Sequence, residues 1–211
     1  MNTLALECST ARGSVAASSG GEQVFSERFT AARGHGSALF EVLERALKAL
    51  GKCDQVIVGL GPGSYSGVRI AIAAAIGLEL GLDCALAGIP SIAAIETEER
   101  SYLVVGDARR QQFFLARVDD GIVTEGPILL SLSDLEQRAT SAGALPVFSS
   151  APITTLPYLR IAFPSAEMLA LLGERCQGIV ATGSLVPIYL RDPHITQPRE
   201  VKKTPFSRES I

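Results

Sequence analysis

The sequence predicts an α/β protein built from two lobes of the same topology, and three observations lead to this prediction. Of the 211 residues, 47% are hydrophobic and 19% are charged, which suits one large domain or two small lobes. A pattern of three short strands followed by a helix occurs near the N-terminus and again from Tyr102 onward. In both copies the first strand ends in an acid, Glu7 and then Asp107. An internal duplication of this kind indicates two lobes that divide near residue 100.

The first lobe is expected to begin with a three-stranded meander and a helix. The three strands are Leu4–Cys8, Ser14–Ser19 and Gln23–Phe29, with Gly20–Gly21 as the hairpin turn between the last two. Leucines at helical spacing then predict a helix from about Leu39 to Leu50, with Ser37 as its N-cap and Gly51 at its end.

A glycine-rich loop divides the next strand from the next helix. Val56–Leu60 is expected to be a buried strand, Gly61–Gly67 the loop, and Val68–Leu82 the helix. A strand at Cys84–Ala87 and a helix after Pro90 are expected to complete this lobe, which spans residues 1–100.

The second lobe, residues 101–190, repeats the opening and then becomes depleted. Its expected strands are Tyr102–Val105, Gln112–Val118 and Ile122–Leu130, followed by a short helix from Ser133 to about Thr140. The stretch Ala144–Leu159 holds three prolines, and Glu167–Leu172 is the last clear helix. Residues 191–211 form a polar, proline-containing tail that is expected to follow a surface.

Composition argues against several classes of protein. Nineteen Lys and Arg against 22 Asp and Glu give a formal charge of −3, whereas a free-standing nucleic-acid binder normally has a basic excess. The apolar content excludes an intrinsically disordered chain. The longest uncharged apolar run, Ile70–Leu78, is far shorter than the roughly 20 residues that cross a bilayer. The N-terminus has no basic segment before an apolar core, so we expect a cytoplasmic protein with no membrane contact.

Cysteine and histidine are too sparse for a metal centre. The four cysteines, Cys8, Cys53, Cys84 and Cys176, include no CxxC pair, and buried reduced thiols are favoured over disulfides or a zinc site. The two histidines, His35 and His194, form no ligand cluster. No metal site is expected.

The glycine loop permits two interpretations. Its Gly61, Gly63, Ser64 and Gly67 lead into a helix N-terminus, where exposed backbone N–H groups favour an anion. The loop nevertheless lacks the lysine of a Walker motif and does not match GxGxxG. A tight strand-to-helix connection and a phosphate cradle therefore both remain open.

The acids Glu7 and Asp107 also permit two interpretations. At the ends of equivalent strands they could face each other across an inter-lobe cleft, where a phosphotransferase would hold Mg²⁺ and orient a nucleophile. Alternatively they cap loops. The extra methylene of Glu7 displaces its carboxylate from the position that an Asp would give it, which weakens the catalytic interpretation.

The helix Val68–Leu82 carries apolar residues around its whole circumference, so we expect both of its sides to be buried. Ala73, Gly77 and Gly81 lie on one face at four-residue spacing, and such small residues let another backbone approach closely. That second backbone is either the helix Leu39–Leu50 of the same lobe or another protein.

Four motifs together resemble the TsaB (YeaZ) family, and the resemblance spans nearly the whole chain. They are Leu4–Thr10, Gly59–Ile70, Asp107–Arg110 and Pro187–Arg191. The resemblance implies an actin-like ATPase, sugar-kinase and Hsp70 superfold with two RNase-H-like lobes, the second one reduced. It also implies a role in making N6-threonylcarbamoyladenosine next to the anticodon of tRNAs that read codons beginning with A.

The resemblance further implies that the chain supports the catalytic paralogue TsaD and has no catalytic residues or resident cofactor of its own. TsaD and TsaE are then the expected protein partners, with tRNA bound only through the complex and ATP or ADP only at a complex interface. The family is expected to pair through helices of the first lobe, with TsaD or as a homodimer. The expected partner-binding residues are Leu39, Leu43, Ala73, Gly77 and Gly81.

The chain departs from the family pattern in two places. The family's first strand usually ends in Asp, where this chain has Glu7, so the loop Gly61–Gly67 with Glu7 and Asp107 is interpreted as a vestigial nucleotide or anion site. His35–Ala38 also differs from the usual His-Ser-Glu. A small-molecule kinase or nucleotide hydrolase of the same superfold is the alternative function, and it would bind ATP alone.

Overall fold

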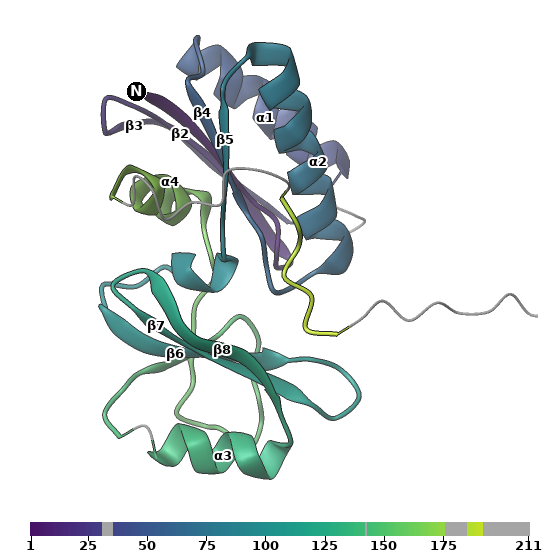
Figure 1. The fold of residues 1–211 in the computed structure, drawn as a ribbon, viewed down its shortest axis with the longest axis vertical. Coiled ribbons are helices and arrows are strands. Elements are labelled where there is room, and N and C mark those ends of the chain that lie inside the picture. The colour runs from purple at the N-terminus through teal and green to yellow at the C-terminus, as the bar shows by residue number, and fades with distance from the viewer. Residues whose placement is uncertain (31–35, 142, 176–184, 192–211) are drawn as a thin grey trace, which may run out of the picture.

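The computed structural model describes residues 1–30, 36–141, 143–175 and 185–191, and these contain two five-stranded sheets (Figure 1). The first sheet has the order β3-β2-β1-β4-β5, with β1 Asn2–Glu7, β2 Arg12–Ser19, β3 Glu22–Thr30, β4 Gln55–Gly59 and β5 Ala85–Ile89. The second has the order β10-β9-β6-β7-β8, with β6 Ser101–Asp107, β7 Phe113–Asp119, β8 Ile122–Leu130, β9 Val147–Ser149 and β10 Arg160–Ile161.

The two sheets share one topology. In each, the first three strands form an antiparallel meander, and the last two strands run parallel to the first. The expectation of an α/β fold with two similar lobes is therefore confirmed. The second lobe is reduced, because β9 has three residues and β10 has two. The proposed boundaries at residues 100 and 190 stay predictions, and the tail beyond Arg191 lies outside the described residues.

Helices cover both faces of the first sheet (Figure 1). On one face lie α1 (Gly36–Leu50) and α2 (Tyr65–Leu82), and on the other lies α4 (Ala166–Arg175). Side chains alternate along a strand, so Leu4 and Leu6 of β1 join the core beneath α1 and α2, whereas Ala5 joins the core beneath α4.

The core beneath α4 is shared by both lobes. It includes Ile57 of the first sheet, Tyr102 and Val104 of the second, and Leu169 of α4. The approach of α4 is close, since a Cβ added to Gly173 would lie 2.0 Å from Cδ1 of Ile57. The helix α4 therefore packs on the first sheet, although it follows the second sheet in sequence.

On the other face of the second sheet, α3 (Leu132–Ser141) closes a smaller core. Leu135 is its fully buried contact with the sheet, and Leu103, Val105 and Leu115 face it from β6 and β7.

Three local expectations differ from the structure. The helix expected from Val68 begins at Tyr65, because the Ser64 hydroxyl accepts a hydrogen bond from the Gly67 amide at 3.3 Å and caps it. The segment after Pro90 is a single 3₁₀ turn, η1 (Ser91–Ala94), and not an α-helix. Ser37 lies inside the first turn of α1 and is not its N-cap, since that helix begins at Gly36.

Only one side of α2 is buried within the described chain, whereas the sequence predicts burial of both. One side packs on the first sheet through Val68, Ala71 and Ala75, but Leu80 on the other side is 80% exposed. By length and composition alone, this 18-residue helix of mean hydropathy 1.4 could cross a membrane. Its buried side belongs to the core that α1 and α2 form with the first sheet, and a cytoplasmic location stays a prediction.

Candidate functional site

The glycine loop packs directly against the turn between β1 and β2. The amide of Ser64 donates a hydrogen bond to the carbonyl oxygen of Ser9 at 2.6 Å. A Cβ added to Gly63 would lie 2.1 Å from that same oxygen. Glycine is therefore required at position 63, because any side chain would displace the backbone of the neighbouring turn.

Several amides of this loop already donate within the chain. The amide of Gly61 donates to the Ser91 hydroxyl at 3.0 Å, and the amide of Gly67 donates to the Ser64 hydroxyl at 3.3 Å. With the Ser64 amide also engaged, these donors are not presented to a ligand. Of the two interpretations that the sequence leaves open, this geometry favours the tight strand-to-helix connection over the phosphate cradle.

The acids Glu7 and Asp107 make the same local contact in the two lobes. Oε1 of Glu7 accepts a hydrogen bond from the Ser9 amide at 2.5 Å, and Oδ1 of Asp107 accepts one from the Arg109 amide at 2.7 Å. Each carboxylate thus caps the turn that follows its strand. This is the second of the two interpretations that the sequence permits for these acids.

Their surroundings nevertheless differ. Glu7 is fully buried, and a Cβ added to Gly59 would lie 2.0 Å from its Oε2 and 2.6 Å from the Ser91 hydroxyl. Asp107 is exposed. The carboxylate of the first lobe is therefore enclosed by its own lobe, whereas its counterpart in the second lobe faces solvent.

The thiols are structural. Cys8, Cys53 and Cys84 are free and buried, as expected, and Cys176 lies outside the described residues. Burial, with the Glu7 charge beside it, raises the pKa of the Cys8 thiol and keeps it protonated. In the described ranges, no group of three or more His, Cys, Asp or Glu side chains is arranged to hold a metal ion.

The small-residue face of α2 is exposed. A Cβ added to Gly77 or Gly81 would meet no atom within 4 Å, and Ala73 is exposed on the same face. In the described part of the chain, this face therefore does not pack on α1, which was one of the two interpretations. Beside it lie the exposed apolar side chains of Ile76 and Leu80.

Leu39 and Leu43, two of the expected partner-binding residues, are not on the surface of the folded chain. They are 0% and 5% exposed and form the core between α1 and the first sheet. Phe40, which is not among the residues that the sequence predicts to bind a partner, is 54% exposed on α1. An aromatic residue on the charged side of an amphipathic helix was the signal that could have identified it.

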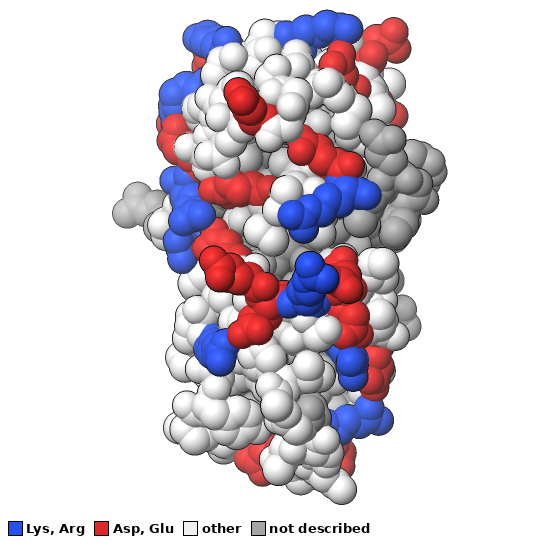
Figure 2. Space-filling model, turned by 90° about the vertical axis from the view of Figure 1, so that its left-hand side faces the viewer, with Lys and Arg blue, Asp and Glu red and all other residues white. Residues whose placement is uncertain are grey.

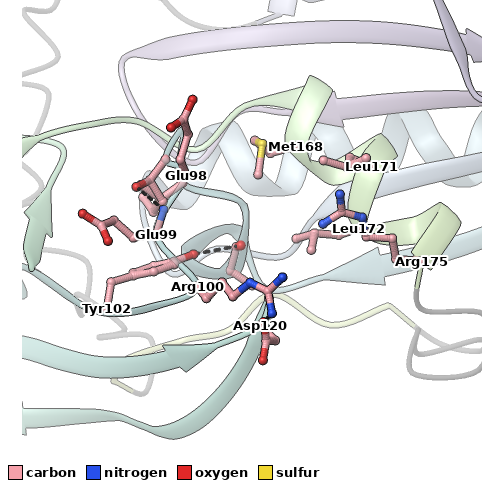
Figure 3. A pocket seen from close by; sticks show the side chains of 13 residues that line it. Glu98, Glu99, Arg100, Tyr102, Asp120, Met168, Leu171, Leu172 and Arg175 are labelled. Atoms are coloured by element: carbon pink, nitrogen blue, oxygen red, sulfur yellow. Dashed lines mark hydrogen bonds and ion pairs between the residues drawn. The ribbon is translucent and has the colours of Figure 1, made fainter. Parts of the chain in front are cut away.

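A pocket of about 440 Å³ lies near the junction of the lobes, away from the glycine loop (Figure 3). Its apolar wall comes from Met168, Leu171 and Leu172 of α4, and its rim carries side chains of both charges, Glu98, Glu99, Arg100, Asp120 and Arg175. None of the residues that the sequence singled out lines this pocket.

The surface on the α4 side carries both charges in alternation (Figure 2). Ion pairs join many of them, for example Arg28 with Glu96 at 2.6 Å and Arg160 with Glu99 at 2.8 Å. This face therefore shows no basic excess of the kind that attracts nucleic acid.

Comparisons with known proteins agree with the two-lobed fold. Residues 28–134 match the family model described as TsaD, tRNA N6-adenosine threonylcarbamoyltransferase. An uncharacterized protein of Mycobacterium tuberculosis strain H37Rv is 33% identical over 176 residues, which cover 81% of this chain and 82% of that protein. An uncharacterized protein of Mycobacterium bovis matches to the same extent.

Among solved structures, YeaZ from Pseudomonas aeruginosa superposes with a TM-score of 0.75 at 22% identity, over 90% of this chain and 99% of that one. This likeness concerns the fold. The expected actin-like superfold of two RNase-H-like lobes is confirmed.

Proposed function

This chain belongs to the TsaD family as a relative of TsaB (YeaZ), and from that premise we propose that it is a non-catalytic partner subunit for TsaD. In this proposal it supports the formation of N6-threonylcarbamoyladenosine next to the anticodon of tRNAs that read codons beginning with A. The family match supports the broader part of the proposal, a role associated with tRNA modification.

The exposed face of α2 is the observation that carries the proposal. Its small residues, Ala73, Gly77 and Gly81, leave room for a second backbone, and the neighbouring Leu80 is 80% exposed. Burying apolar surface gains roughly 25 cal/mol per Å², so a helix laid on this face would gain free energy from side chains now in water. We propose that this helix comes from TsaD, or from a second copy of the chain when TsaD is absent.

The buried state of Glu7 supports the absence of a separate catalytic activity. A phosphotransferase needs its acid to reach metal and substrate, whereas the carboxylate of Glu7 is fully buried and caps its own turn. Under this proposal TsaE is a further protein partner and tRNA is bound only through the complex. ATP or ADP would bind only at a complex interface.

Gly77→Leu tests the interface. The new side chain would fill the open space over the helix, so we expect a near-normal melting temperature together with loss of TsaD binding, measured by co-elution and calorimetry. Thr140→Leu is the matched control, because it adds an exposed leucine to α3 of the other lobe and should leave TsaD binding unchanged.

Two results would contradict the proposal. The first is a Gly77→Leu variant that still binds TsaD with unchanged affinity. The second is ATP turnover by the isolated chain that exceeds a buffer blank and is abolished by Asp107→Ala. That second result would instead support the kinase or nucleotide hydrolase hypothesis.

A further inference from the structure

The segment Leu185–Arg191 runs from the first lobe to the second (Figure 1, yellow-green). At its first-lobe end, Leu185 is buried in the core beneath α1 and α2. The amide of Ile188 then donates to the Leu60 carbonyl at 2.8 Å, directly before the glycine loop. The ring of Tyr189 lies 5.6 Å from that of Tyr65, the first residue of α2.

The other end of the segment reaches the turn between β6 and β7. Nη2 of Arg191 donates to the Arg109 carbonyl at 3.0 Å and also to Oε1 of Gln112. The same Arg109 carbonyl oxygen also accepts a hydrogen bond from the Gln112 amide at 3.1 Å. Because Arg191 contacts both Arg109 and Gln112, one guanidinium holds the two ends of the turn. Hydrogen bonds from a charged donor are stronger than neutral ones.

The turn that Arg191 contacts has an unusual backbone. Arg109, Arg110 and Gln111 have φ values of +65°, +55° and +60°. Non-glycine residues rarely adopt this left-handed region, and they stay there only when surrounding contacts hold them. The equivalent turn between β1 and β2 is described throughout and has no residue with positive φ. The unusual turn is thus the one that the segment contacts.

We propose that Leu185–Arg191 is an inter-lobe strap that ties the glycine loop to the Asp107 turn and, through Arg191, holds that turn in its left-handed conformation. The first lobe anchors the strap through Leu185 and Ile188, and the second receives its guanidinium. Arg191 is a positioning residue, because it acts on the backbone of the turn, and the strap makes the shape of this turn depend on the first lobe.

Amide hydrogen exchange of the full-length chain, followed by NMR, tests the strap. In Arg191→Ala, the amides of Ala108 and Gln112, which hydrogen-bond within the turn, should exchange about tenfold faster or more. The Ser9 amide, which donates to the Glu7 carboxylate in the equivalent turn of the first lobe, should keep its wild-type rate. Arg191→Lys should give an intermediate rate, because an ammonium lacks the guanidinium's fork of donors.

Arg175→Ala is the control for the loss of one arginine, since this exposed side chain lies on α4, away from the turn. It should leave the Ala108 and Gln112 amides at wild-type rates. Unchanged protection of these two amides in Arg191→Ala would overturn the proposal. Equal acceleration of the Ser9 amide would also overturn it, because the variant would then have lost global stability and not a local contact.

Discussion

The glycine loop and the exposed face of α2 both depend on glycine, but their glycines have opposite surroundings. A Cβ on Gly63 would strike the Ser9 carbonyl oxygen at 2.1 Å, whereas a Cβ on Gly77 would meet nothing within 4 Å. In the loop the chain has already filled the space that glycine provides. On α2 that space is open in the described chain. Glycine spacing alone therefore does not distinguish an internal contact from a surface that awaits a partner.

Gly63→Ala should have the largest effect. The backbone at this position does not require positive φ, so the cost is steric, and it falls on a backbone oxygen that cannot rotate away. We expect a loss of about 3 kcal/mol in the free energy of unfolding, measured by urea denaturation. A variant as stable as wild type would show that the loop does not pack on Ser9.

Gly59→Ala should have a smaller but clear effect. Its Cβ would lie 2.0 Å from Oε2 of Glu7 and 2.6 Å from the Ser91 hydroxyl, and both are side-chain atoms that can shift by rotation. We expect a loss of about 2 kcal/mol, together with chemical-shift changes at the Ser9 amide that Glu7 caps. If the Ser9 signal stayed unchanged, the close packing of Gly59 of β4 against Glu7 would be wrong.

Gly77→Ala should have the smallest effect and the opposite sign. In a helix interior, alanine is more favourable than glycine by about 1 kcal/mol, and no neighbour is present to offset this gain. The midpoint of urea denaturation should rise slightly. A decrease would mean that part of the chain covers this face, and the contrast between the two regions would then fail.

Much of the fold is predictable from the sequence because its signals are local. The antiparallel meanders follow from alternating apolar residues and glycine turns, and the repeat of Glu7 by Asp107 identifies the duplication. The small strands β9 and β10 escape prediction. Prolines interrupt Ala144–Leu159, which contains β9, and β9 forms only by pairing with β6, while β10 pairs only with β9.

The candidate site is less predictable, since its properties depend on neighbours that are distant in sequence. The sequence shows Gly59 and Gly63, but it does not show that Glu7 and Ser91 crowd the first and Ser9 the second. Helical spacing predicts that Leu39 of α1 and Leu80 of α2 are both packed against a neighbour. In the structure Leu39 is buried and Leu80 is exposed. Periodicity gives the direction of a side chain on a helix and does not say whether a partner is present in that direction.

The position of α4 also has a consequence for how the protein folds during its synthesis on the ribosome. The first sheet is complete by Ile89, but the helix that covers its second face is made only at residues 166–175. At a translation rate of about 5–20 residues per second, the nascent sheet would wait several seconds with Ala5, Ala16 and Ile57 uncovered. During that interval the emerging chain offers an apolar surface to chaperones or to its neighbours on a polysome, and the first sheet cannot finish folding before residues 166–175 are made.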